Sequence, residues 1–176
     1  LPAHASLFTG LFPCQHGAIT KKEEDVLSGK PLPDWEHVLA RTLKTHGYST
    51  GGFVGGPFLK AKFGFAQGFD HYDDQWEGFD QKAGQINEKA FRWLKKQAAS
   101  PFFLFINYFD PHAPYYPPDD FDSPFLGRYD GDIDFSKFGP HSVKKGKVPP
   151  LEGADKKQAI DLYDSEILYA DHCLGQ

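Results

Sequence analysis

Two stretches of the chain carry apolar residues at the three- and four-residue spacing of an amphipathic helix. In residues 83–99 the apolar side consists of Ile86, Ala90, Trp93 and Leu94. In the stretch that starts near Asp155 it consists of Ile160, Tyr163, Ile167, Ala170 and Leu174. This spacing places the apolar side chains on one side of a helix. Both stretches are therefore predicted to be amphipathic helices.

A shorter helix is predicted at the start of the chain. Pro2 suits the first turn of a helix over residues 3–9, because its fixed φ fits that turn, and Gly10 ends the helix. Residues 13–33 then show no sustained period and are interpreted as a surface excursion. Within them, residues 21–25 are expected to be a solvated run of charges.

Helix–strand alternation indicates an α/β fold. Asp34 can cap a third helix that Gly47 closes, and residues 48–54 then favour a short strand. The helix over residues 83–99 is followed by Phe-Phe-Leu-Phe-Ile at residues 102–106. Five consecutive large apolar residues are typical of a strand buried on both faces of a parallel sheet. The two helix–strand pairs are therefore interpreted as parts of one α/β domain.

A long irregular stretch follows the second strand. Residues 113–153 are rich in Pro, Gly and Asp and show no sustained period. A stretch of this length inside a compact domain is usually an active-site lid or a subdomain insertion. Residues 113–153 are therefore predicted to be a lid or loop insertion.

Composition excludes several classes of protein. The 176 residues are 40% hydrophobic and 16% aromatic, which argues for a packed core and against disorder. The net charge is −5 and no broad basic field is present, so no nucleic-acid partner is expected. The longest apolar run, residues 101–109, is too short to span a bilayer. Two cysteines, Cys14 and Cys173, form no disulfide framework and say little about the redox compartment.

Four short strings occur in a fixed order along the chain. They are LPAHASLFTGLFP at residues 1–13, followed by His16-Gly17; GYSTGGFVGGPF at residues 47–58, followed by FGFAQGFD at residues 63–70; PFFLFINYFDPHAPY at residues 101–115; and YDSEILYAD at residues 163–171. Together they resemble the sulfatase family of the alkaline phosphatase superfamily. The resemblance spans nearly the whole chain and is loosest over residues 119–154. It implies an alkaline-phosphatase-like α/β sandwich with a mostly parallel central sheet flanked by helices.

The first string implies a nucleophile one residue before Leu1, at the start of the first helix. Free N–H groups and the helix dipole stabilise a sulfate or phosphate at such a place. His4 stands where sulfatases that mature a Cys or Ser to formylglycine carry Arg. A Pro-x-His version occurs in phosphodiesterase-like relatives that use an unmodified Thr or Ser. Formylglycine therefore stays possible, and His4 is predicted to be catalytic, with a helix residue contacting backbone as the alternative.

The second string departs from the family pattern. Residues 54–57, Val-Gly-Gly-Pro, stand where many sulfatases have a Gly-Lys-Trp-His step whose Lys and His touch the sulfate. Those two contacts are therefore expected to be absent at this place. Lys60 or Lys62, which follow closely, could reach the site instead; Lys60 is the candidate substrate-binding lysine, with a solvated side chain as the alternative for each.

The third string ends in the Pro-His pair that sulfatases use at the anion site. The resemblance implies that His112 binds the sulfate of the substrate and helps to protonate the leaving oxygen. Ligands of open α/β sheets bind at the carboxyl ends of strands, and His112 lies just past one. An imidazole suits both tasks because it changes charge near neutral pH. In the fourth string, Glu166 and Asp171 are expected to be solvated on a polar helix face and to carry no chemistry.

The resemblance implies a sulfuric ester hydrolase that acts on a small-molecule or glycan sulfate ester. A divalent metal is expected to assist the nucleophile, with Ca²⁺ as the metal and Zn²⁺ as the alternative. Its ligands are expected outside residues 1–176, which are interpreted as a sulfatase domain truncated at both ends and inactive alone. The alternatives are a phosphodiesterase or phosphotransferase of the same superfamily and a non-catalytic carbohydrate-binding relative. The family is often periplasmic, extracellular or lysosomal.

Overall fold

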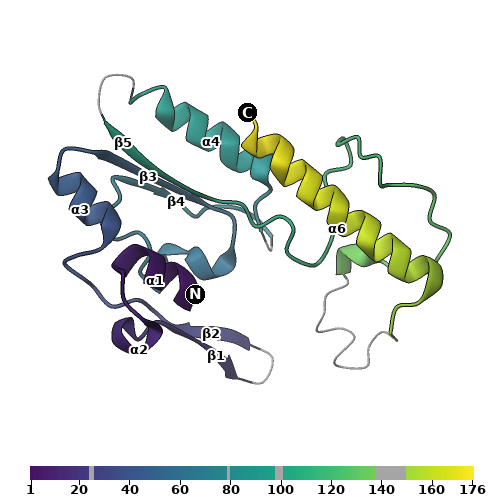
Figure 1. Ribbon diagram of the computed structural model, residues 1–176, viewed down its shortest axis with the longest axis horizontal. Helices are drawn as coiled ribbons and strands as arrows, with labels where there is room; N and C mark the ends of the chain where they lie inside the picture. Colours follow the sequence, from purple (N-terminus) through teal and green to yellow (C-terminus); the bar gives the residue numbers. More distant parts are fainter. Residues whose placement is uncertain (24–25, 79, 98–100, 138–149) are drawn as a thin grey trace. The chain divides into compact units, whose positions relative to one another are not determined.

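The computed structural model describes the chain except for residues 24–25, 79, 98–100 and 138–149. The described residues form two compact units, Leu1–Phe109 and Asp110–Gln176, and each is described here by itself (Figure 1). The prediction of a lid or insertion over residues 113–153 falls in the second unit and stays a prediction. Among the described residues, no helix is both long and apolar enough to cross a membrane.

The first unit is built on a three-stranded parallel sheet. The central strand is β3 (Ser49–Val54), which lies between β4 (His71–Asp73) and β5 (Phe102–Asn107). In the pairing of β3 with β5, Ser49 stands opposite Phe102 and Val54 opposite Asn107. The strands predicted over residues 48–54 and 102–106 and their parallel arrangement are therefore confirmed, whereas β4 was not predicted.

Two glycines allow aromatic rings to lie directly on β3. A Cβ at Gly51 would lie 2.9 Å from the Trp93 ring, and a Cβ at Gly52 would lie 2.5 Å from the Tyr72 ring. Because successive strand residues face opposite sides of a sheet, the two rings cover opposite faces of the strand. The glycines thus bring both layers close to the central strand.

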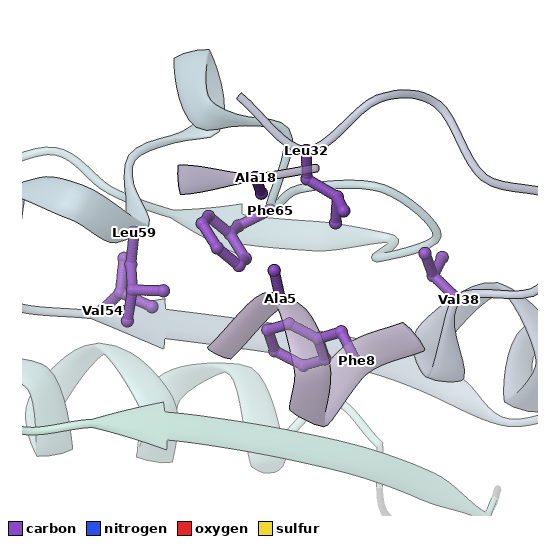
Figure 2. Packing of buried hydrophobic residues seen from close by; sticks show 8 residues of the cluster. All are labelled: Ala5, Phe8, Ala18, Leu32, Val38, Val54, Leu59 and Phe65. Carbon is purple, nitrogen blue, oxygen red and sulfur yellow. The ribbon is translucent and has the colours of Figure 1, made fainter. Parts of the chain in front are cut away.

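Helices cover both faces of the sheet (Figure 1). On one face α4 (Ala83–Leu94) packs Ile86, Ala90 and Trp93 against Phe53, which confirms the predicted apolar side of this helix. On the other face α1 (Pro2–Thr9) buries Ala5 and Phe8. Figure 2 shows this second cluster, whose members are Ala5, Phe8, Ala18, Leu32, Val38, Val54, Leu59 and Phe65.

The helix at the start of the chain follows its sequence signals. Pro2 occupies the first turn of α1, and the backbone N–H of Gly10 bonds to the Ser6 carbonyl with Gly10 at φ 69°. Glycine adopts this left-handed conformation without the steric cost that a Cβ brings. The predicted helix over residues 3–9 is therefore confirmed, with its end at Gly10.

Residues 13–33 are more ordered than predicted. They contain a short helix, α2 (Pro13–His16), and an antiparallel hairpin of β1 (Ile19–Glu23) and β2 (Val26–Lys30). Ala18 and Leu32, on either side of the hairpin, are buried in the cluster of Figure 2. The segment lies largely at the surface, as interpreted, but it is ordered and contributes two residues to the core. The side chains of the charge run at residues 21–25 lie outside what the structure describes.

The helix predicted from Asp34 begins later than expected. The observed helix is α3 (Leu39–Thr45), with Val38 at its N-cap. The Gln67 side chain holds the preceding backbone, because its Oε1 accepts the Trp35 N–H at 2.9 Å and its Nε2 donates to the Pro33 carbonyl at 2.9 Å. Asp34 instead pairs with Arg41 at 2.8 Å. The hydrogen bonds of the distant Gln67 side chain thus determine the backbone here, and the capping signal of Asp34 is not used.

Strand β5 is less buried than its sequence suggests. Its side chains are half-buried, and Phe102 is 47% exposed. Within the described sheet β5 is an outer strand, since only β3 pairs with it. Both faces of the strand are nevertheless covered, with Phe103 and Phe105 packed against one cluster and Leu104 and Ile106 against the other, so the expectation is confirmed with partial burial. Further short elements of this unit are the 3₁₀ helices η1 (Pro57–Leu59) and η2 (Ala61–Phe63).

The second unit consists of an irregular segment that packs on one long helix, α6 (Gly153–Leu174). A short 3₁₀ helix, η3 (Phe135–Lys137), lies in the irregular segment. Aromatic side chains of the irregular segment pack against α6. The ring centroids are 5.5 Å apart for Tyr115 and Tyr163 and 5.1 Å apart for Phe121 and Tyr169. The start of the helix near Asp155 is confirmed, but the predicted apolar side is largely exposed in this unit, as Ile160, Tyr163, Ile167 and Leu174 show.

The expectation that Glu166 of α6 is solvated is also wrong. Its side chain is fully buried, and one carboxylate oxygen accepts the Tyr116 N–H at 3.1 Å. Glu166 therefore tethers the irregular segment to the helix and is not a solvated surface residue, because a buried carboxylate needs hydrogen bonds to offset its lost hydration. Asp171 is exposed, as expected.

Candidate active site

The first turn of α1 is directed toward the carboxyl ends of the strands. The His4 ring lies 6.3 Å from Phe105, and the Phe8 ring lies 5.8 Å from Phe69, which stacks on Phe103 at 5.8 Å. The Phe8 ring also lies 4.8 Å from Phe105, and Figure 1 shows that α1 runs in the direction opposite to β3 and β5. Open α/β sheets bind their ligands at the carboxyl edge, and a helix N-terminus favours an anion.

His4 is half-buried between two phenylalanine rings. Its ring meets Phe65 and Phe105 edge-on, with centroids 6.5 Å and 6.3 Å away. Burial lowers the pKa of the His4 imidazole below its ordinary value. No hydrogen bond joins this ring to another residue in the part of the chain that the structure describes. His4 is therefore a neutral imidazole near pH 7, the alternative of a contact with backbone is not seen among the described residues, and its catalytic role stays a prediction.

The lowered pKa of His4 has a consequence for stability against pH. The unfolded chain takes up a proton near the ordinary histidine pKa, whereas the folded chain does so only at lower pH. Stability contributed by the neutral ring is therefore present above that ordinary pKa and is lost as pH falls from it toward the lowered value. We expect the free energy of unfolding to decrease between pH 7.5 and 5.5, and to decrease less in a His4→Gln variant, as measured by urea unfolding. Equal decreases in both proteins would contradict this.

His16, from the first sequence string, forms a structural pair with Ser6. The ring is buried, its Nδ1 accepts the Ala18 N–H at 3.0 Å, and its Nε2 lies 3.0 Å from Ser6 Oγ. Since Nδ1 is the acceptor, the neutral ring carries its proton on Nε2 and donates it to the hydroxyl. His16 is thus unable to act as a base toward Ser6, despite the resemblance to a catalytic pair.

The end of β3 leaves no room for side chains. A Cβ at Gly55 would lie 2.7 Å from the backbone oxygen of Gln81, and a Cβ at Gly56 would lie 2.7 Å from the Phe109 ring. The Gly55 N–H also bonds to the Asn107 carbonyl at 3.0 Å. The glycine step is therefore packed between neighbouring segments, and it offers no side-chain contact to a substrate.

Lys60 lies beside the carboxyl end of β4. Its ammonium group is 4.1 Å from the centre of the Trp76 ring, a cation–π geometry. The adjacent backbone is fixed by buried Asp74, whose carboxylate accepts the Ala61 N–H at 2.8 Å. Lys60 is thus held by an aromatic ring, and its contact with a substrate stays a prediction.

His112 is exposed and follows the last residue of β5 by five positions. Its Nδ1 donates a hydrogen bond to the Ala113 carbonyl at 2.6 Å. The peptide bonds Asp110-Pro111 and Ala113-Pro114 on its two sides are both cis. A proton fixed on Nδ1 makes Nε2 the nitrogen that accepts or releases a second proton.

The three predicted site residues belong to different units. His4 and Lys60 lie in the first unit and His112 in the second, so their assembly into one site stays a prediction. No three His, Cys, Asp or Glu side chains come together as a metal site among the described residues. The chain as described therefore supplies no metal-binding set, and both cysteines are free thiols.

Comparisons with known proteins identify the family to which this chain belongs. The sequence profile of the family described as "Sulfatase" matches residues 2–176. The chain belongs to the sulfatase family. The resemblance of the four strings is thereby confirmed.

Solved structures with the same fold include two that were determined with saccharides. BT4656, solved with its substrate D-glucosamine-2-N,6-O-disulfate, matches with a TM-score of 0.61 and 15% identity over 99% of this sulfatase-family chain and 50% of its own. Ps i-CgsB, solved with k-i-k-neocarrahexaose, matches with a TM-score of 0.56 and 17% identity, over 99% of this chain and 42% of its own.

A third structure is the lipoteichoic acid synthase LtaP from Listeria monocytogenes. It matches with a TM-score of 0.53 and 21% identity, over 99% of this chain and 38% of its own. At these identities the likenesses show the fold, and they confirm the predicted α/β class. This sulfatase-family chain spans half or less of the length of each structure.

Proposed function

We propose that the full-length protein hydrolyses sulfate esters through a nucleophile that immediately precedes Leu1. The nucleophile attacks the sulfur atom, the S–O bond to the alcohol breaks, and the alcohol leaves after receiving a proton. Water then releases sulfate. The observation that carries this proposal is the direction of α1, whose first turn, with half-buried His4, lies toward the carboxyl edge of the parallel sheet.

His4 serves this reaction as a neutral hydrogen-bond donor. Burial lowers the pKa of its imidazole, so at neutral pH the ring offers one N–H and adds no positive charge. Such a donor stabilises negative charge that develops on the transferred group, and it does so strongly where water is excluded. The edges of Phe65 and Phe105 limit the freedom of the ring, so the donor is positioned before the substrate arrives.

His112 supplies the proton for the leaving oxygen. The hydrogen bond from Nδ1 to the Ala113 carbonyl sets the tautomer, and it leaves the proton transfer to Nε2. A protonated His112 would also attract the sulfate group. Lys60, held against Trp76 in the same unit as His4, is the proposed additional anion contact.

A divalent cation, Ca²⁺ or alternatively Zn²⁺, is proposed to bind to residues outside this chain. When bound, it would neutralise the anion and lower the pKa of the nucleophile. The described residues contain no set of ligands for it.

The proposed substrate is a sulfated saccharide. BT4656 shares the fold and was solved with a disulfated glucosamine as its substrate. The test is to supply the full-length protein with Ca²⁺ or Zn²⁺ and to compare an aryl sulfate, D-glucosamine-2-N,6-O-disulfate and a bis-aryl phosphate. Sulfate release from the first two supports the proposal.

Phosphodiester cleavage is the second candidate function. It is favoured by the packed glycine step, because Gly55 and Gly56 leave no room for the lysine and histidine that many sulfatases place there. Preferential turnover of the bis-aryl phosphate would transfer the protein to this class. Turnover of none of the three esters would reject both functions and leave a saccharide-binding relative.

A further inference from the structure

The outer side of α4 and the turn after it carry a row of polar residues, of which only Lys89 is bonded to a described strand of the sheet. The row consists of Gln85, Glu88, Lys89, Arg92 and Lys96. The three- and four-residue spacing of Gln85, Glu88, Lys89 and Arg92 places them on one side of the helix, along about 10 Å of its axis, and Lys96 follows in the turn after the helix ends at Leu94. Two adjoining cavities open along this side, and both are lined by Lys89 and Arg92. We call the two cavities together the α4 cleft.

The first cavity, of about 260 Å³, is cationic. Its lining includes Trp93, which is 8% exposed and lies directly on the backbone of Gly51 in β3. Lys89 is clamped by Asp73 Oδ1 and by the Gln75 carbonyl, each at 2.7 Å. The floor and one wall of the cavity are therefore fixed by packing and by hydrogen bonds.

Two positive charges remain uncompensated in this cavity. The carboxylate of Asp73 offsets the charge of Lys89. Arg92 and Lys96 are exposed and have no ion-pair partner among the described residues. His71 completes the lining with ring nitrogens. The cavity thus offers a guanidinium and an ammonium group around an aromatic floor, which suits a sulfate group on a sugar.

The second cavity, of about 390 Å³, has a different lining. Besides the shared Lys89 and Arg92, it contains Trp76, Glu77, Gln81, Gln85 and Glu88. Amides and carboxylates bond to hydroxyl groups, whereas Glu77 and Glu88 disfavour a second anion at this end. The α4 cleft therefore changes from cationic to hydroxyl-binding along its length.

We propose that the α4 cleft is an accessory site for a sulfated saccharide. The sulfate group binds between Arg92 and Lys96, and the neighbouring sugar hydroxyls bond to Gln81, Gln85 and Glu88. The second cavity reaches Trp76, whose ring also contacts Lys60. The first cavity, which takes the sulfate group, lies on the face of the sheet that α4 covers, whereas His4 lies on the face that α1 covers. It therefore binds a part of the polymer away from the reacting ester, and only the choice of a sulfated ligand rests on the proposed function.

Neighbouring lysines provide a matched test. Lys95 and Lys96 are both exposed, but only Lys96 lines the cleft, so Lys95→Gln and Lys96→Gln change the net charge equally. The full-length protein and both variants are run by affinity electrophoresis in native gels that contain dextran sulfate or unsulfated dextran. We expect Lys96→Gln to weaken binding to dextran sulfate roughly tenfold, since a hydrogen bond to a charged group is lost. Lys95→Gln should bind as the wild type does, and Arg92→Gln should repeat the loss.

Turnover of a small aryl sulfate separates this site from the active site. It should be unchanged in Lys96→Gln and Arg92→Gln, because a small ester does not reach the first cavity. Equal losses of dextran sulfate binding in Lys95→Gln and Lys96→Gln would overturn the proposal, since they indicate diffuse attraction. Loss of aryl sulfate turnover would overturn the accessory role. If the wild type cleaves no ester but binds dextran sulfate through Lys96, the proposed function fails and the α4 cleft stands.

Discussion

Replacing His112 with alanine is expected to lower sulfate-ester turnover by roughly 10²- to 10⁴-fold, the usual contribution of a general acid. His112 Nδ1 donates to the Ala113 carbonyl at 2.6 Å, so the transferable proton resides on Nε2. Without the imidazole, the leaving alkoxide would depart unprotonated or take its proton from water. The measurement is kcat of the full-length protein with an aryl sulfate series of increasing leaving-group pKa.

The dependence of the kcat loss on the pKa of the leaving group distinguishes a loss of general-acid catalysis from a loss of structure. Esters of acidic phenols need little protonation, so they should lose least in the His112→Ala variant, and esters of alkyl alcohols should lose most. His37→Ala is the matched control, because His37 is also exposed and has no hydrogen bond, ion pair or ring contact within the described part of the chain. An equal loss for all leaving groups would refute the proton-transfer role, and a similar loss in His37→Ala would refute any special role.

The parallel sheet was predictable because its signals are local. Five apolar residues in a row specify β5 at residues 102–106, and the glycine-rich run around Gly51 and Gly52 still forms the central strand. The length of β4, only three residues, gives no comparable pattern. It is held by its pairing with β3, which a sequence pattern does not contain.

The errors arose where distant residues decide the local structure. Gln67 fixes the backbone at Pro33 and Trp35, so the capping signal of Asp34 is not used. Glu166 is buried, and its carboxylate accepts a hydrogen bond from the Tyr116 N–H, 50 positions away in the sequence. A polar side chain that bonds to a distant backbone group occurs at the same sequence spacing as one that faces solvent. Their roles therefore could not be predicted from periodicity.

The candidate site was predictable in part. The family resemblance singled out His4 and His112, and the departure at residues 54–57 was visible as a missing lysine and histidine. The sequence did not contain the packing of His4 between Phe65 and Phe105, which lowers its pKa. It also did not show that His16 uses both ring nitrogens in structural bonds. These properties depend on which side chains meet after folding.

Replacing Phe8 with alanine is expected to destabilise the protein by about 3–5 kcal/mol, the usual cost of removing a buried aromatic ring. Phe8 is 4% exposed and meets three other rings, with centroids 4.8 Å away for Phe105, 5.8 Å for Phe69 and 6.0 Å for Phe65. Figure 2 shows it in the cluster that joins α1 to the sheet. The measurement is the free energy of urea unfolding of the full-length protein.

The adjacent residue supplies the control, and activity supplies a second measurement. Leu7 is 60% exposed on the same helix, so Leu7→Ala removes a similar apolar side chain without opening a cavity and should cost less than about 1 kcal/mol. Because Phe8 holds the helix that carries His4, Phe8→Ala should also lower kcat under conditions in which the protein stays folded, while Leu7→Ala should not. If Phe8→Ala cost no more stability than Leu7→Ala, α1 would not be anchored through this cluster, and the direction given to its first turn would have to be withdrawn.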